Sequence, residues 1–123
     1  MDFINFIKTL IFGRQISQKT KKLVLSVNSK YTQIYNNSDS AIKKSYIVEL
    51  DSALSACLND LYGKDSVANN LKKAKLKFNK TTYQNLWEGH KIRNKIIHEP
   101  TLFIDTKTLN YGILSLIKGI KSF

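Results

Sequence analysis

Apolar residues recur along this chain at intervals of three and four positions, and alternation of apolar with polar residues is rare. Such spacing gathers the apolar side chains on one face of an α-helix, whereas a half-buried strand needs a repeat of two. No internal repeat or low-complexity tract stands out. The sequence therefore predicts an all-α protein, built as an up-and-down bundle of four to five helices.

Polar breaks divide the chain into five expected helices. The first three are expected over residues 17–35, 40–62 and about 66–78, and Gly63 is expected to end the second in a left-handed conformation. Side chains that can cap the helices precede each of the later ones: Asn37, Ser38 or Asp39 for the second, Asp65 or Ser66 for the third, Thr81 or Thr82 for the fourth, and Asp105 or Thr106 for the last.

The fourth helix should end at His98 or Glu99, because Pro100 disfavours a helical conformation of the residue before it. A last helix follows a short loop, and its apolar face is Leu109, Ile113, Leu116, Ile117 and Ile120. Cys57 is the single cysteine, which excludes an internal disulfide and agrees with a reducing cytoplasm. Its helical, apolar setting is typical of a small buried side chain.

A chain of 123 residues is expected to form one domain, which we place at residues 15–123. Residues 1–14 form a separate apolar, amphipathic segment. Its run is too short to cross a bilayer, and it lacks the features of a secretory signal. Residues 3–12 can pack on the domain, on a second copy or on a membrane surface, and packing is the commoner outcome.

The charge of the chain is strongly one-sided, with 20 Lys and Arg against 9 Asp and Glu, a formal net charge of +11. That balance favours a polyanionic partner such as RNA, DNA or an anionic membrane, although solvated surface lysines are the simpler explanation. Residues 66–87 contain no acidic residue and lead into residues 87–100, a segment in which rare residue types gather. The candidate RNA-binding lysines are Lys72, Lys73, Lys75, Lys77, Lys80, Lys91 and Lys95.

Residues 87–100, WEGHKIRNKIIHEP, hold the only Trp, the only Pro, both His and one of the Arg residues of the chain. On a helix, His90, Asn94 and His98 form one ridge, with Arg93 beside it. Leu86 and Ile97 share this half of the helix, which therefore faces a packed or partner-facing side. Polar groups buried there need hydrogen-bonding partners. The structural alternative is that His90 and Asn94 bond across helices and His98 suits the helix C-terminus.

The hexapeptide from Arg93 to His98 fits the R-x-x-x-x-H pattern and resembles that of the HEPN superfamily, whose members are small helical bundles and often ribonucleases. The embedded string W-x-x-H-x-x-R-N-x-x-x-H-E-P strengthens the likeness. Upstream, the helix around residues 51–61, the Gly63 turn and the Leu71, Ala74 and Phe78 pattern are similar in order to small prokaryotic HEPN-like proteins. The likeness covers roughly residues 17–123.

The resemblance implies a metal-independent endoribonuclease without a cofactor, in which His98 transfers a proton and Arg93 stabilises charge on the phosphate. Asn94 would orient the phosphate or the imidazole. His90 and Glu99 are the supporting positions, although a fold-stabilising hydrogen bond explains His90 equally well, and Glu99 with Pro100 more simply shapes the helix end. Trp87 is expected in the core.

The resemblance also implies a homodimer, because family members usually pair two motifs across one cleft. The apolar N-terminal segment and the face with Leu86 and Ile97 are the candidate contact surfaces. Such a protein would be a cytoplasmic toxin or defence component with an antitoxin partner. Toxin members with a Y-x-Y motif after the His are modified by a partner enzyme, and no such motif follows His98. The competing functions are a non-catalytic helical module that binds RNA or protein, and a membrane-peripheral protein.

Overall fold

The computed structural model describes residues 2–4, 7, 15–37 and 39–123, and it confirms the all-α prediction. The described part contains the helices α2 (Gln18–Ser26), α3 (Tyr31–Tyr35), α4 (Ser40–Tyr62), α5 (Val67–Lys73), α6 (Lys80–His98) and α7 (Thr106–Ile120), and no strand. Apart from residues 2–4 and 7, the N-terminal segment lies outside the described residues. No helix in the described ranges has the length and apolar character that crossing a membrane requires.

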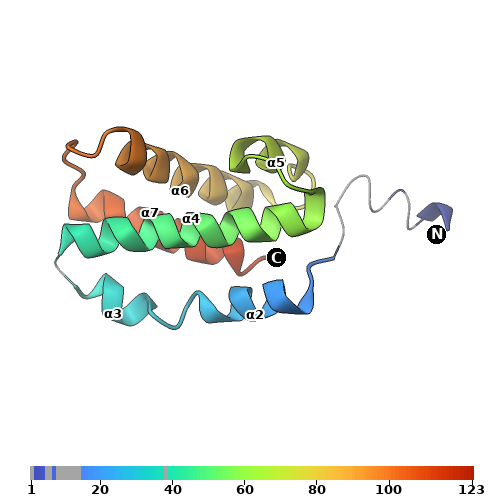
Figure 1. The fold of residues 1–123 in the computed structure, drawn as a ribbon, viewed down its shortest axis with the longest axis horizontal. Coiled ribbons are helices and arrows are strands. Elements are labelled where there is room, and N and C mark those ends of the chain that lie inside the picture. The colour runs from blue at the N-terminus through green and yellow to red at the C-terminus, as the bar shows by residue number, and fades with distance from the viewer. Residues whose placement is uncertain (1, 5–6, 8–14, 38) are drawn as a thin grey trace.

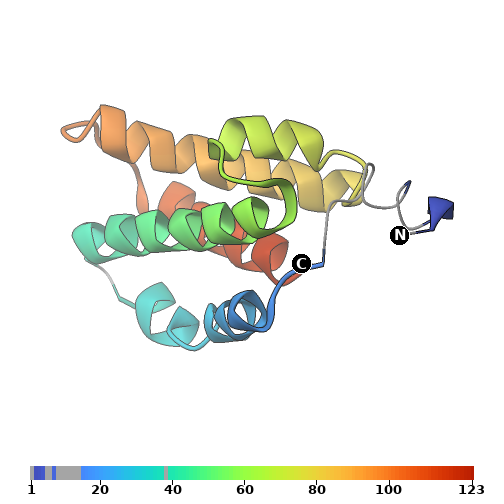
Figure 2. The ribbon, with the colours of Figure 1, turned by 45° about the vertical axis from the view of Figure 1, so that its right-hand side comes forward.

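Helix α4 lies at the centre of the fold and contacts every other helix from α2 to α7. Figures 1 and 2 show α2 and α3 on one side of α4 and α5 and α6 on the other. In Figure 1 the chain runs in one direction through α2 and α3, back through α4, forward again through α6 and back through α7. The short α5 lies beside the C-terminal end of α4, before α6 begins.

The core lies where α4, α6 and α7 meet. Its fully buried side chains include Ile47, Leu54, Leu58, Leu86, Leu109, Ile113, Leu116 and Ile120. Helices α6 and α7 approach closely because Gly119 of α7 leaves room for Leu86, and Gly89 of α6 leaves room for Leu116. A Cβ atom at either glycine would overlap the facing leucine. Of the two roles expected for the half of α6 with Leu86, packing or contact with a partner, Leu86 serves packing, because its own chain buries it completely.

The single helix expected over residues 17–35 is wrong, because a turn at residues 27–30 divides it into α2 and α3. The Tyr46 hydroxyl of α4 donates a hydrogen bond to the carbonyl oxygen of Val27. In a continuous helix that oxygen would accept the amide of Tyr31. The amide of Tyr31 instead bonds to the Asn28 carbonyl oxygen at 3.2 Å. A contact with α4 thus ends the first helix where its sequence alone predicts continuation.

Most other boundaries agree with the expected ones. Side chains of Asp39, Ser66 and Asp105 cap α4, α5 and α7. Two predictions need correction. Helix α5 ends at Lys73 rather than near Phe78, and α6 is capped by Asn79 rather than by a threonine, since the Asn79 Oδ1 atom accepts the Thr82 amide at 2.8 Å.

Gly63 ends α4 as expected, but its conformation differs from the expected one. Its φ of 91° lies in the region that glycine alone adopts easily, whereas its ψ of 167° is extended rather than left-handed helical. The Gly63 amide still donates to the Asn59 carbonyl oxygen at 2.9 Å, which satisfies an acceptor at the helix end. The backbone therefore leaves α4 abruptly and leads into α5.

Candidate functional site

Helix α6 places some residues of the segment 87–100 in the protein interior and others at the surface. Its apolar residues Leu86 and Ile92 are buried against the core, which fixes the rotation of the helix. His90 is buried by the same rotation, whereas Arg93 and Asn94 are half-buried. His98, the last residue of α6, is exposed. The expected polar ridge therefore begins inside the protein and ends at its surface.

His90, Arg93 and Asn94 meet a fourth residue, Asp51 of α4, in what we call the polar cluster. The Nδ1 atom of His90 lies 2.9 Å from Oδ1 of Asp51, and its Nε2 atom lies 3.3 Å from Nδ2 of Asn94. Nη1 of Arg93 donates to Oδ1 of Asn94 at 3.1 Å. Nε of Arg93 lies 3.4 Å from Oδ2 of Asp51, an ion pair whose geometry falls short of a hydrogen bond. The four side chains thus form a closed ring of contacts.

Sequence reasoning missed Asp51 as a functional residue. A signal was present, because Asp51 lies four positions after Ile47 and three before Leu54, which places a carboxylate on the buried face of α4. A charge at such a position is rarely buried without a partner. Its partners, however, lie 39 and 42 positions further along the chain, and the sequence does not identify them.

Arg93 is the member of the polar cluster that reaches solvent, with 32% of its side chain exposed. Among the described residues, its Nη2 atom has no hydrogen-bonding partner, so part of the guanidinium can still donate to a ligand. Its charge is partly balanced by Asp51, which is almost fully buried. The guanidinium is therefore both fixed in place and partly neutralised.

The polar cluster forms one wall of an open hollow of about 410 Å³, which we call the Arg93 hollow. Its other walls come from α4, from the connection after α4 and from the start of α5: Ser52, Ser55, Asp65, Ser66, Val67 and Ala68. Hydrogen bonds from the Asn69 side chain and the Ser66 amide lower the pKa of Asp65. Asp65 therefore stays ionised, and two carboxylates line the hollow beside one guanidinium.

His98 does not line the Arg93 hollow. It lies five positions after Arg93, which turns it by about 140° around the helix axis. Glu99 is exposed and caps the end of α6 through its backbone amide, which bonds to the Lys95 carbonyl oxygen at 2.9 Å. The structure thus brings Arg93, Asn94 and His90 together but leaves His98 and Glu99 apart from them on the same protomer.

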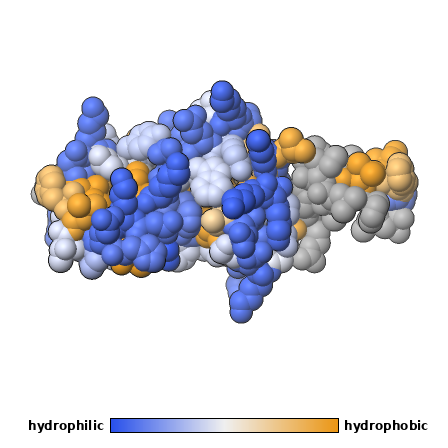
Figure 3. All heavy atoms as spheres, turned by 90° about the horizontal axis from the view of Figure 1, so that it is seen from above, coloured by the Kyte–Doolittle hydropathy of each residue, from blue (hydrophilic) through white to orange (hydrophobic). Residues whose placement is uncertain are grey.

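The candidate RNA-binding lysines divide into two groups. Six are exposed on α5, on the turn after it and on α6, namely Lys72, Lys73, Lys75, Lys80, Lys91 and Lys95. Figure 3 looks onto the side that α5 and α6 form and shows that this face is largely hydrophilic. Lys73 pairs with Asp65 at 3.4 Å and Lys91 with Glu88 at 3.7 Å, which reduces the positive charge of both lysines available to a polyanion.

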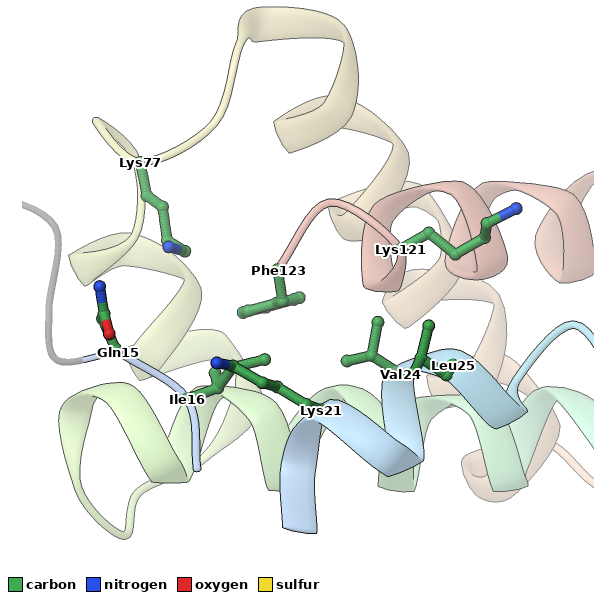
Figure 4. Close-up of a pocket in the computed structure, with 8 residues that line it drawn as sticks. All are labelled: Gln15, Ile16, Lys21, Val24, Leu25, Lys77, Lys121 and Phe123. Atoms are coloured by element: carbon green, nitrogen blue, oxygen red, sulfur yellow. The ribbon is translucent and has the colours of Figure 1, made fainter. Parts of the chain in front are cut away.

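Lys77 lies elsewhere, at a second open hollow of about 470 Å³ that Lys21, Lys121, Phe123 and residues of α2 also line. Figure 4 shows the Lys77 side chain directed into this hollow. Partial burial lowers the pKa of Lys77. Lys77 is therefore separated from the Arg93 hollow, whose lining does not include it.

The remaining predictions concern core residues and metals. Cys57 is buried, and burial raises the pKa of its thiol to about 12, so it is a packing residue as expected. Trp87 is partly buried against the core, and its ring lies edge to face with that of His90, with centroids 6.3 Å apart. Within the described ranges, His, Cys, Asp and Glu side chains form no group of three that could hold a metal ion.

Comparison of the chain with protein-family models, with curated proteins and with solved structures finds no match. The functional interpretation therefore depends on the residues and their geometry.

Proposed function

We propose that this protein is a metal-independent endoribonuclease of the HEPN type, with a HEPN-like up-and-down bundle as its scaffold. The observation that supports the proposal is that Arg93 is held in place by its neighbours and still reaches solvent. Its guanidinium is held by Asp51 and Asn94 with 32% of the side chain exposed, and an exposed His98 follows at the end of the same helix. A fixed guanidinium and a solvent-accessible imidazole are the two groups that this chemistry requires.

The proposed reaction is a transesterification within the RNA. A ribose 2′-oxygen loses its proton and attacks the adjacent phosphorus, while the bond from phosphorus to the 5′-oxygen breaks. The products are a 2′,3′-cyclic phosphate and a 5′-hydroxyl, whose proton comes from an acid. His98 acts as the base or the acid because imidazole titrates near neutral pH, and Arg93 stabilises the charge that builds on the phosphate oxygens.

Such a reaction needs two proton-transfer groups, and one protomer offers His98 alone at the surface of α6. The site is therefore proposed to be completed by a second copy of the chain, which adds its own His98 and Arg93. Exposed apolar residues adjoin His98 and suit this contact, namely Ile97, Leu102 and Phe103, of which Phe103 is 86% exposed. Of the two surfaces expected for dimer contacts, the face of α6 offers the exposed Ile97, and most of the N-terminal segment lies outside the described residues.

The test is cleavage of varied RNAs by the purified protein in the presence of a metal chelator, with His98→Ala as the decisive variant. His98 is exposed, so its loss should leave the free energy of unfolding within about 0.5 kcal/mol of the wild type. Cleavage should disappear, while the RNA dissociation constant should stay nearly unchanged. Gln84→Ala is the matched control, because Gln84 is an exposed residue of the same helix outside the proposed site, and this variant should keep activity.

Mass spectrometry should identify the cyclic phosphate on the 5′ fragment. Fragments with other termini, cleavage that the chelator stops, or equal activity of the wild type and His98→Ala would contradict the proposal. An active protein of this kind fits a cytoplasmic toxin or defence component that an antitoxin restrains, and co-expression of a neutralising partner would be needed for growth.

A second candidate, a non-catalytic HEPN-like module that binds RNA or protein, is favoured by one specific observation. Asp51 pairs with Arg93, and Asp65 lines the same hollow, so the site is less positive than Arg93 alone would make it, which disfavours a bound phosphate. This module would bind RNA through the exposed lysines of α5 and α6 without cleaving it. Its signature is an RNA affinity that falls steeply with salt while the RNA stays intact.

A further inference from the structure

The polar cluster carries an inference about proton positions, because its two ends have fixed hydrogen-bonding roles. An arginine side chain only donates hydrogen bonds, and an ionised aspartate only accepts them. Arg93 contacts both Asn94 and Asp51, and Asp51 contacts both His90 and Arg93. The roles of Asn94 and His90, which lie between these ends, follow from them.

Arg93 fixes the orientation of the Asn94 amide, and the amide fixes the protonated nitrogen of His90. Since Nη1 of Arg93 can only donate, the Asn94 atom at 3.1 Å from it must be the amide oxygen. The Asn94 amide nitrogen then faces Nε2 of His90 at 3.3 Å and donates to it, which requires that Nε2 carry no proton. The remaining nitrogen, Nδ1, carries the proton and donates it to Asp51 at 2.9 Å.

We infer that His90 is a neutral imidazole protonated at Nδ1, and that Asp51 and His90 are positioning residues: Asp51 holds Arg93 directly, and His90 holds it through Asn94. The part that concerns Arg93 as a phosphate-binding group rests on the proposed function. The protonation state of His90 does not, because it follows from the contacts of Asn94 with Arg93 and His90 together with the donor and acceptor atoms of these side chains.

A consequence is that protonation of His90 and the bond between Arg93 and Asn94 exclude each other. A proton on Nε2 would face the Asn94 amide nitrogen, so two donors would meet. Rotation of the amide by 180° would relieve this contact but would turn the amide nitrogen toward Nη1 of Arg93, again a donor facing a donor. Acidification should therefore release Arg93 from Asn94 as His90 gains its second proton.

In the part of the chain that the structure describes, few charged groups lie around His90. Asp51 faces it from α4, Arg93 stands one turn further along α6, and Asp65 lines the hollow from the connection to α5. Asp65 is engaged with the Ser66 amide, the Asn69 side chain and Lys73. The buried residues that α7 contributes to the core include no titratable side chain. His90 is thus coupled chiefly to Asp51 and Arg93.

The same geometry argues against a serine hydrolase site. An Asp51 and His90 pair with Ser52 and Ser55 in one hollow has the residue types of a catalytic triad. In such a triad the histidine nitrogen opposite the aspartate accepts the serine hydroxyl proton. Here that nitrogen faces Asn94, and neither serine hydroxyl bonds to it among the described contacts. The cluster is built to hold Arg93 rather than to activate a serine.

The test is nitrogen NMR of the wild-type protein, which contains only two histidines. The spectrum of His98→Gln assigns the remaining signals to His90. At neutral pH, Nδ1 of His90 should show the shift of a protonated ring nitrogen and Nε2 that of an unprotonated one. On acidification, the Arg93 Nε–H signal should move in step with the His90 ring signals.

His90→Gln is the matched variant, because an amide side chain offers one donor and one acceptor but does not titrate in this range. In this variant the Arg93 signal should no longer change with pH. If the protein cleaves RNA, the fall in cleavage rate that accompanies the change of the Arg93 signal on acidification should also be absent. The inference is overturned if Nε2 carries the proton, if both nitrogens are protonated at neutral pH, or if the Arg93 signal keeps its pH dependence in His90→Gln.

The two proposals fail separately. If the NMR signature is found and no RNA is cleaved, the ribonuclease proposal is wrong and the assignment of His90 stands. If RNA is cleaved and His98→Ala is inactive but Nε2 of His90 is protonated, the positioning role is wrong and the ribonuclease proposal stands.

Discussion

Arg93 reaches from α6 to α4, where its Nε atom lies 3.4 Å from the Oδ2 atom of Asp51. This contact joins the segment with the rarest residues of the chain to a carboxylate in the buried face of the central helix. It also has two opposing effects on a bound phosphate. It fixes the guanidinium in one place, and it supplies a competing negative charge. The balance of these effects separates a catalytic site from a binding surface.

Replacing Asp51 should destabilise the fold. In Asp51→Asn, the Arg93 charge loses its partner and one of the two contacts becomes a pairing of donors. Breaking a fully buried pair costs about 3 to 5 kcal/mol, and the partial exposure of Arg93 reduces this, so we expect a loss of about 2 kcal/mol in the free energy of unfolding. Chemical denaturation measures it. Glu49→Gln on the same helix is the control, since its pair with Lys30 is exposed; an equal effect of the two variants would contradict this explanation.

Gly119→Ala tests the close packing of α6 on α7. Alanine favours the helix by about 1 kcal/mol relative to glycine. The added Cβ atom, however, would overlap the fully buried Leu86, and overpacking of a core costs about 1 to 3 kcal/mol. We expect a net loss of about 1 kcal/mol, visible as a lower Tm. Ser52→Ala, on an exposed position of α4, should not lower it. A more stable Gly119→Ala would show that the helices separate without cost.

Cys57 predicts a specific pH dependence of stability. Its pKa is about 12 in the folded protein, because burial disfavours the thiolate, whereas an unfolded cysteine titrates near about 8.5. Between these values the folded state holds a proton that the unfolded state has lost, so stability falls as pH rises, by up to about 1.4 kcal/mol per unit. Chemical denaturation at about pH 8, 9 and 10 should reveal this slope in the free energy of unfolding.

Cys57→Ala should reduce that slope, because it removes the titrating thiol from both states. The wild-type thiol should also resist an aromatic disulfide reagent until denaturant is added, since Cys57 is fully buried. Rapid modification of the native protein would show that the thiol reaches solvent and that its environment differs from the one described.

Asn79→Ala tests the start of α6. The Asn79 side chain satisfies the amide of Thr82, and loss of such a cap costs about 1 kcal/mol. Thr81→Ala alters an exposed residue within the first turn and should change stability by less than about 0.5 kcal/mol. Urea unfolding of both variants decides between the observed cap and the threonine caps that the sequence suggests. A larger effect for Thr81→Ala would favour the latter.

The sequence by itself determined the extents of α4, α6 and α7 and which of their faces are apolar. The spacing of Leu50, Leu54 and Leu58 in α4, and of Leu109, Ile113 and Leu116 in α7, predicts these helices because periodicity is a local property of the chain. The end of α6 before Pro100 is local for the same reason. The sequence also identified Arg93, Asn94 and His90 as a group, although it did not predict their contact with Asp51 on another helix.

Only the tertiary structure decided what these groups contact. The break between α2 and α3 depends on the Tyr46 hydroxyl, and the state of Arg93 depends on Asp51, and both partners come from α4. The separation of Lys77 from the other lysines likewise follows from the path of the chain after α5. Hydrogen bonds and ion pairs act over a few ångströms in space, so residues far apart in the sequence meet only after packing has fixed how the helices lie.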